Sequence, residues 1–499
     1  MTPSKSDRAA ILSKIESLVQ NKFYAPDFNG HNWREIVDQS RSLVLEAANR
    51  EDFEAQITSM LNKLGSSGLG LLGPHTKITP RNAINASFTS VHAPHDGLRW
   101  VFQDILPGGV SDRAGIHPGD VLISIAEQQI APPSKPAFAM GKTISVVVSR
   151  DGEHSEVHLD LHTPRPKYKD NPYAEPQSIS AALASSSLGR LRVSLFPGKI
   201  GIDFSNELAA TFTDQLANAE RLVIDLRGNP GGGVGALRLM SFLTPASQPV
   251  GYSLDRPSAE RGYDRNTLPR FNKIPRSKLA IPLLAVKFFG KKSVVLETEG
   301  LGSRRFHGRV VLLVNEHSTG AAEMVAQFAK ENSLATIVGT KTPGHLAARS
   351  AFKLGSGYRL TIPIGAYISW KGTRIEGRGI DPDIAVPWSV RRRSPQRRQP
   401  ARQGYRSRER SLDASVNLQR IEIRRLVLIV SRCQKIRTRR CSSEIQDHAD
   451  GATFVIPLSA GASVSQYGPR CLIQTDRYGI NAGITHFRQD DQHSDARGR

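Results

Sequence analysis

A chain of 499 residues with 39% hydrophobic and 23% charged residues is long enough to form roughly three domains of about 150 residues each. Its net charge of +21 would by itself suggest an acidic partner such as nucleic acid. The charge is uneven, however: from Arg391 onward the chain has 22 Lys or Arg and 10 Asp or Glu, a net of +12. The preceding residues carry only +9, so we expect no specific nucleic-acid partner for them.

The cysteines and the N-terminus narrow the class of protein further. Cys433, Cys441 and Cys471 all follow Arg391, which excludes a disulfide scaffold and cysteine catalysis in the first 390 residues. Residues 1–8 run into a charged helical pattern without the apolar region of a secretory signal, so we expect a cytoplasmic protein without a membrane span. A start codon assigned too late would hide a signal and make the protein exported.

Three apolar stripes at helical spacing lie between about residues 6 and 65. They predict an N-terminal helical domain over residues 1–73. The stripes are Ile11, Leu12, Ile15, Leu18 and Val19; Trp33, Ile36, Val37 and Val44; and Phe53, Ile57, Met60, Leu61 and Leu64.

Residues 77–162 change to short strands separated by Pro-Gly turns. The run Leu-Pro-Gly-Gly-Val-Ser-Asp-Arg-Ala-Gly-Ile-His-Pro-Gly-Asp at 106–120 resembles a bacterial PDZ domain. The resemblance implies that an extended peptide adds to a sheet edge while loop amides hold its terminal carboxylate. That loop is expected at Ala83, Ile84, Asn85 and Ala86, although glycine would be easier at position 85. The alternative is a PDZ domain that serves only as a rigid spacer.

Residues 163–178 are rich in proline and charge and predict an extended linker. From there to residue 388, strand and helix patterns alternate as in an α/β domain. The expected strands are 191–196, 222–226, 310–314 and 334–338, the expected helices are 207–217, 234–243 and 321–330, and 358–363 with 366–370 predicts a closing hairpin.

Two segments of this region are the most informative in the chain. Residues 222–233 read Leu-Val-Ile-Asp-Leu-Arg-Gly-Asn-Pro-Gly-Gly-Gly, and residues 310–323 read Val-Val-Leu-Leu-Val-Asn-Glu-His-Ser-Thr-Gly-Ala-Ala-Glu. Each is an apolar strand that runs into a small-residue turn and then a helix, where α/β proteins place reactive groups. The order of these segments and their residues resemble the C-terminal-processing (tail-specific) serine peptidase family over about residues 6–388. The resemblance implies a multidomain α+β protein with a helical N-terminal domain, a PDZ domain and a crotonase-like α/β peptidase core over 179–388.

The resemblance also assigns the catalytic positions. An acyl-transfer site needs a nucleophile at a helix start, a base, and N–H groups directed at the oxyanion. The family's nucleophilic serine, three residues before the glutamate of its motif, falls on Gly320. The base of the lysine-dependent branch falls on His345. The oxyanion N–H groups fall on Gly231 and Ala321.

Residues 64–70, Leu-Gly-Ser-Ser-Gly-Leu-Gly, resemble the Leu-Gly-x-Ser-His-Thr-Gly segment of the tricorn-like branch. In that register the histidine position is Gly68, and His75 is near but out of register. Glu376 falls on the glutamate that completes the tricorn-like constellation; the alternative is a carboxylate that only bonds to backbone or arginine. Ser318 is a second candidate hydroxyl, since His317 precedes it, and Thr319 is a weaker one.

These positions indicate a serine endopeptidase family member that recognises unfolded or C-terminal peptide segments and has a degenerate catalytic site. The alternative is a non-catalytic PDZ scaffold that binds peptides. A dinucleotide loop at 231–235 fails because Ala236 stands where a third glycine is needed. We expect no cofactor and no metal.

From Arg391 onward the chain has 21 arginines and one lysine. This composition indicates a disordered tail, either fused or read from another frame, and we expect no secondary structure there. Arginine-rich RNA binding is the alternative reading.

Overall fold

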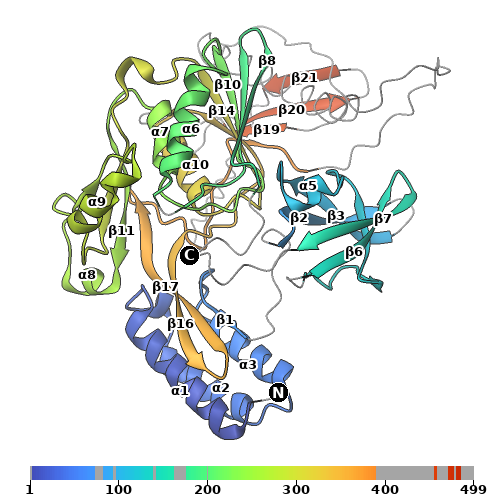
Figure 1. Cartoon of the computed structure of the whole chain (residues 1–499), viewed down its shortest axis with the longest axis vertical. Coiled ribbons are helices and arrows are strands. Elements are labelled where there is room, and N and C mark those ends of the chain that lie inside the picture. Colours follow the sequence, from blue (N-terminus) through green and yellow to red (C-terminus); the bar gives the residue numbers. More distant parts are fainter. Residues whose placement is uncertain are drawn as a thin grey trace, which may run out of the picture. The chain divides into compact units, whose positions relative to one another are not determined.

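The computed structural model describes residues 3–73, 83–93, 97–138, 142–161, 176–198, 200–388, 454–457, 470–476 and 479–484 (Figure 1). The chain divides into two compact units. The first comprises residues 1–335, 341–380 and 389–404, and the second comprises 336–340, 381–388 and 405–499. Most of the predicted linker at 163–178 lies outside the described residues.

The predicted N-terminal helices are present. They are α1 (Lys5–Lys22), α2 (Trp33–Leu45) and α3 (Arg50–Asn62), with a 3-10 turn, η1 (Phe28–Gly30), after α1. Each α-helix begins where a side chain accepts a hydrogen bond from the first turn: Ser4 for α1, Asn32 for α2 and Asn49 for α3. Every residue of the three predicted stripes except Leu18 is buried, and Leu18 packs against the same core.

The helices share their core with the strand that follows α3 and with two strands from the far end of the first unit. These strands are β1 (Gly70–Leu72), β16 (Ala347–Gly355) and β17 (Tyr358–Ser369), all antiparallel. Leu354, Tyr358, Leu360 and Ile362 are buried in one cluster with α1, α2 and α3. The expected hairpin of 358–363 with 366–370 is wrong, because β17 continues through both segments and pairs with β16 and with β11 (Pro249–Asp255).

Residues 83–161 form a second sheet around their own core. The strands are β2 (Ala86–Ala93), β3 (Gly97–Ile105), β4 (Val121–Ile125), β5 (Gln128–Gln129), β6 (Lys142–Arg150) and β7 (Glu153–Leu161). Their order is β2-β3-β4-β6-β7, so β2 lies at an edge, and β5 pairs with β4. The short helix α5 (Val110–Arg113) contributes Val110 to the core.

The α/β part contains β8 (Ile179–Ser185), β9 (Leu188–Val193), β10 (Arg221–Asp225) and β14 (Arg309–Val314), in the order β14-β10-β9-β8. β10 is parallel to both of its neighbours. The helices α6 (Ile202–Thr213), α7 (Ala236–Leu243) and α10 (Ala321–Glu331) lie together beside this sheet in Figure 1. The predicted alternation of strands and helices is therefore present, with boundaries shifted by a few residues.

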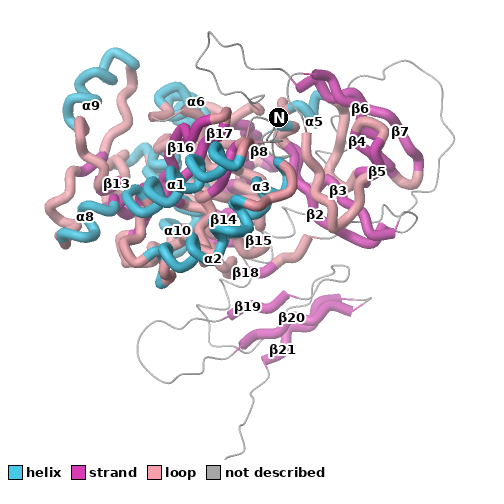
Figure 2. The backbone as a smooth tube through the Cα atoms, turned by 90° about the horizontal axis from the view of Figure 1, so that it is seen from below, coloured by secondary structure: helices cyan, strands magenta, loops and turns pink. Residues whose placement is uncertain are grey.

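A further sheet in the first unit has the order β1-β17-β11-β13-β12, where β12 is Arg270–Phe271 and β13 is Val294–Glu297. Short helices connect its strands. They are α8 (Arg256–Arg261), η2 (Lys278–Ala280), α9 (Ile281–Lys287) and, after β13, η3 (Gly302–Arg304). Figure 2 shows α9 extended on a long loop beyond β13.

The second unit contains β15 (Thr336–Gly339) paired in parallel with β18 (Ile384–Ala385). It also contains an antiparallel sheet of β19 (Phe454–Pro457), β20 (Arg470–Asp476) and β21 (Gly479–Ile484). The expectation that the tail has no secondary structure is therefore wrong for these three segments, and the rest of it lies outside the described residues. Among the described residues, no helix combines the length and apolarity that a bilayer span requires.

Candidate functional site

Gly320, on which the family resemblance places the nucleophile, lies at a sharp turn between β14 and α10. Gly320 is the N-cap of α10 and has φ 62° and ψ −122°. A side chain in this region of positive φ costs about 1–3 kcal/mol, a strain that active sites commonly store. A Cβ built on Gly320 would lie 3.4 Å from Gly231 Cα and 3.6 Å from Pro230 O, which is ordinary contact. The turn thus has room for a side chain at position 320, where the sequence has glycine.

Glu323 fastens the start of α10 to the turn at 342–345. Its carboxylate is fully buried and accepts hydrogen bonds from the N–H groups of Gly320 (3.0 Å), Gly344 (2.7 Å) and His345 (2.8 Å), and from the Thr342 hydroxyl (2.7 Å). Burial raises the pKa of Glu323, and these four donors partly offset the rise.

His345 lies beside the nucleophile position, as the motif spacing predicts. Its carbonyl oxygen accepts a hydrogen bond from the N–H of Gly320 at 3.1 Å. The side chain of His345 is exposed. The contact between the two positions is made by backbone, and Glu323 holds it in place.

Glu376 connects the tricorn-like segment to this turn. One oxygen, Oε1, accepts from the N–H of Ser67 (3.0 Å) and from the hydroxyls of Ser67 (2.7 Å) and Ser66 (3.4 Å). The other, Oε2, accepts from the N–H of Leu346 at 2.8 Å. The segments around 67, 346 and 376 are therefore adjacent. The role of Ser67 was not predicted, although it occupies the serine of the Leu-Gly-x-Ser-His-Thr-Gly pattern.

The histidine position of that pattern is filled by a different side chain. A Cβ on Gly68 would lie only 2.8 Å from both Cγ and Cδ of Arg349, a residue of β16. A histidine at position 68 therefore requires the exposed side chain of Arg349 to shift. Position 75, the near but out-of-register histidine, lies outside the described residues.

Gly231 and Ala321, the expected oxyanion pair, lie next to each other. A Cβ on Gly231 would meet the N atom of Ala321 at 2.8 Å and Thr319 O at 2.7 Å, so this close approach requires glycine. The N–H of Gly231 donates to Asn229 Oδ1 at 2.7 Å. An oxyanion at this position would therefore have to displace the Asn229 side chain to use both N–H groups.

Ser318 does not have the geometry of a nucleophile. It is completely buried, and its hydroxyl donates to the carbonyl oxygen of Leu226 at 2.8 Å and accepts from the N–H of Asn315 at 2.9 Å. Thr319 is also buried. The interpretation of Ser318 as an alternative nucleophile is corrected accordingly, because a buried hydroxyl engaged by backbone cannot reach a substrate.

Asp225, at the end of β10, lies at the centre of a buried ionic cluster. Its carboxylate is fully buried, 2.8 Å from Arg192, 2.9 Å from Arg227 and 4.0 Å from Arg190. Burial alone would raise the pKa of Asp225, but the guanidinium groups of Arg227, Arg192 and Arg190 outweigh it and hold the pKa far below its ordinary value of 3.8. This cluster fixes the strand from which the 227–233 turn departs.

The loop that leads to Gly320 is also tied to the sheet of residues 83–161. Asp104 accepts from Asn315 Nδ2 at 2.8 Å, and Gln103 Nε2 donates to Glu316 at 2.7 Å. Gln103 Oε1 lies 3.2 Å from His317 Nε2. None of these contacts was predicted, because they join residues more than 200 positions apart.

The expected carboxylate-binding loop has a fixed conformation. Ala83, Ile84, Asn85 and Ala86 are buried, and Asn85 has φ 55°, which explains why glycine would be easier there. The Ile84 carbonyl accepts from Ser111, the Asn85 carbonyl from Leu106, and Asn85 Oδ1 from Val110.

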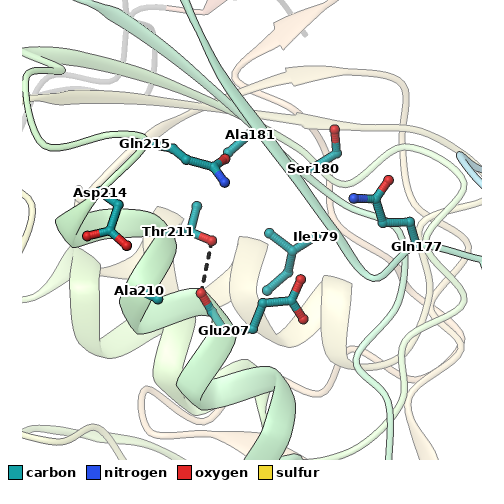
Figure 3. A pocket seen from close by; sticks show the side chains of 9 residues that line it. All are labelled: Gln177, Ile179, Ser180, Ala181, Glu207, Ala210, Thr211, Asp214 and Gln215. Carbon is teal, nitrogen blue, oxygen red and sulfur yellow. Dashed lines mark hydrogen bonds between the residues drawn. The ribbon is translucent and has the colours of Figure 1, made fainter.

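A cavity of about 280 Å³ lies between β8 and α6, away from this site (Figure 3). Ser180 and Ala181 line it from β8, and Glu207, Thr211 and Asp214 from α6 and its end. None of Gly320, His345 and Glu376 lines it, so the cavity is separate from the catalytic positions.

Restoring a side chain at position 320 is expected to lower stability modestly. Gly320→Ser and Gly320→Ala should each reduce the free energy of unfolding by about 1–3 kcal/mol, because φ is positive while the space is adequate. Urea unfolding of the three proteins measures this. A loss well above that range in either variant would mean that steric overlap, rather than backbone strain, controls the position.

Two family models match the chain. Residues 187–386 match peptidase family S41, and residues 4–62 match the Tricorn protease C1 domain. The chain is 22% identical over 385 residues to the carboxyl-terminal-processing peptidase 3, chloroplastic, of Arabidopsis thaliana, covering 74% of this chain and 66% of that protein. It is 23% identical over 398 residues to tricorn protease homolog 1 of Streptomyces coelicolor, covering 74% of this chain and 32% of that protein.

Among solved structures, the photosystem II D1 C-terminal processing protease aligns with a TM-score of 0.47 and 16% identity, over 77% of this chain and 93% of that one. The chain thus spans slightly less than two thirds of the Arabidopsis relative and one third of the Streptomyces relative.

Proposed function

Since this chain belongs to the C-terminal-processing serine peptidase family, we propose that it binds peptide or unfolded protein segments at the peptidase site without cleaving them. The observation that carries the proposal is the glycine at the start of α10, in a turn whose backbone geometry and bracing by Glu323 are intact. In this proposal the chain keeps the backbone of the peptidase site and lacks its reactive group.

The base positions support the same proposal. General-base catalysis raises the rate of acyl-transfer reactions by about 10²–10⁴-fold. The tricorn-like base position is Gly68, whose side-chain space Arg349 fills, and the position of the other branch holds an exposed His345. Neither branch's constellation of nucleophile and base is complete.

A fluorophosphonate probe together with a binding assay tests the proposal. The probe labels activated serines, so the full chain should remain unlabelled. Reduced, carboxymethylated α-lactalbumin should raise the fluorescence anisotropy of a dye on the protein and remain uncut on a gel. Labelling mapped to Ser66, Ser67 or Ser318, or cleavage of the substrate, would show an active peptidase with a rearranged site. Absence of binding would contradict the part of the proposal that assigns peptide binding to the site.

A set of variants tests whether the residues at positions 320 and 68 account for the proposed lack of cleavage. Gly320→Ser alone supplies a hydroxyl without a base, and Gly68→His collides with Arg349. We expect the triple variant Gly320→Ser, Gly68→His, Arg349→Ala to react with the probe at least about tenfold faster than Gly320→Ser, since a positioned base is worth 10²–10⁴-fold. The matched control keeps Arg349 and should stay near the level of Gly320→Ser. Equal labelling rates in the triple variant, the control and Gly320→Ser would show that position 68 does not supply the base.

For the domain at 83–161, we propose binding of peptides with a free C-terminus in the PDZ manner. Two features support this: β2 is an edge strand, and the preceding loop is rigid. Peptides ending in a free carboxylate and an apolar residue should bind at least about tenfold more tightly than their C-terminal amides, because the amide removes the charge that loop N–H groups hold. Isothermal titration measures both. Equal affinities would leave this domain as a spacer.

A further inference from the structure

The segment between β12 and β13 presents an exposed apolar tip. Leu279 is 91% exposed, Leu283 75%, Val286 75% and Phe289 87%. The first three follow one another at i, i+4 and i+7 along η2 and α9, so they share one face. Figures 1 and 2 both show α9 extending outward beyond the strands that carry it.

The base of the segment is anchored, so the exposure of the tip is a property of a fixed element. Ile274 is 1% exposed and its N–H donates to Glu299 at 2.8 Å. Phe288 contacts the buried ring of Phe271, with a centroid separation of 5.7 Å. Turning the tip inward would require these contacts to break.

The same segment is strongly basic. Residues 272–293 contain no Asp or Glu and six cations, all exposed: Lys273, Arg276, Lys278, Lys287, Lys291 and Lys292. Lys278 lies 2.8 Å from Asp203. The other five make no ion pair with the described part of the chain.

We propose that this tip, defined as residues 277–292, docks the protein onto an anionic lipid surface. Exposed leucine, valine and phenylalanine side chains enter the boundary between headgroups and acyl chains, and the flanking lysines meet the lipid phosphates and carboxylates. The charge favours lipid over a second copy of the chain, because a symmetric interface would bring two sets of four cations together. Nucleic acid would use the cations but leave the apolar side chains in water.

Vesicle sedimentation with the full chain tests this, in 0.1 M NaCl, with phosphatidylcholine vesicles that contain or lack 30% phosphatidylserine. Because the arginine-rich tail also attracts anionic lipid, the decisive variants keep all charges. Leu283→Ser with Phe289→Ser should lower partitioning onto the phosphatidylserine vesicles at least about fivefold, since it removes the inserted groups. The matched control is Leu43→Ser with Leu98→Ser, two exposed leucines on α2 and β3, and it should bind as the wild type does.

Lys287→Gln with Lys291→Gln and Lys292→Gln should lower partitioning at least about tenfold and leave the weak binding to pure phosphatidylcholine unchanged. Unaltered melting temperatures would show that each variant folds. Wild-type partitioning of the Leu283/Phe289 variant would overturn the proposal and assign any lipid binding to the tail. A dimer seen by light scattering that this variant abolishes, without vesicle binding by the wild type, would identify a second copy as the occupant instead.

Discussion

Asp225→Asn is expected to lower the free energy of unfolding by about 3–5 kcal/mol, the usual cost of removing one partner from a buried ion pair. The substitution keeps the size of the side chain but removes its charge. Arg192, whose side chain is 8% exposed, then remains buried without a counter-charge. Urea unfolding at pH 7 measures the loss, and Asp38→Asn, an exposed member of an i,i+3 pair with Arg41, should cost less than about 1 kcal/mol. Similar losses in both variants would mean that the cluster contributes nothing beyond a surface pair.

The same ionic cluster predicts that the free energy of unfolding depends on pH. The pKa of Asp225 is depressed in the folded protein, so its charge stabilises the fold above its ordinary pKa of 3.8 and this contribution is lost as the pH falls below it. The stability difference between wild type and Asp225→Asn should therefore be constant from pH 7 to about 5 and shrink below about pH 4. A difference that grows on acidification would contradict this assignment.

Glu323→Ala should be comparably damaging and should act at the candidate site. The substitution removes the acceptor of the Gly344 and His345 N–H groups and of the Thr342 hydroxyl, while the Gly320 N–H keeps its bond to the His345 carbonyl. Each buried unsatisfied donor costs about 1–3 kcal/mol. After relaxation and entry of water we expect a loss of about 3–5 kcal/mol, with increased hydrogen exchange in residues 342–345.

Glu323→Gln should recover only part of this, because its amide NH₂ group would face N–H donors where the carboxylate accepts. Glu35→Ala, an exposed glutamate in the first turn of α2, is the matched control and should cost less than about 1 kcal/mol. If Glu323→Ala unfolds like the control, α10 and the 342–345 turn are held together by other contacts.

Local patterns were sufficient to predict the elements that carry the site. The turn before α10 and the turn after β10 were readable because an apolar strand, small residues and a helical stripe follow one another within about fifteen residues. The family resemblance, rather than this spacing, pointed to His345 and Glu376, and both accept or donate hydrogen bonds in the network around Gly320.

Contacts between distant segments were not predictable. Nothing near Gly68 in the sequence indicates that Arg349 fills its side-chain space, since the two residues meet only through the folding of β16. Ser318 is unsuited as a nucleophile because it is buried, and its burial depends on the neighbouring strand end at Leu226. In β17, Pro363 and Gly365 read as a turn, but pairing with β11 on one side and β16 on the other keeps the strand continuous through a bulge.

The shared core of the N-terminal helices and β17 has a consequence for synthesis on the ribosome. Glu54 of α3 and Tyr358 of β17 are hydrogen-bonded across 304 residues of sequence. At about 5–20 residues per second, α1, α2 and α3 emerge roughly 15–60 s before the strand that covers their apolar stripes. During that interval the nascent chain displays the stripes to its surroundings, so this protein is expected to be a substrate of ribosome-associated chaperones from its first hundred residues onward.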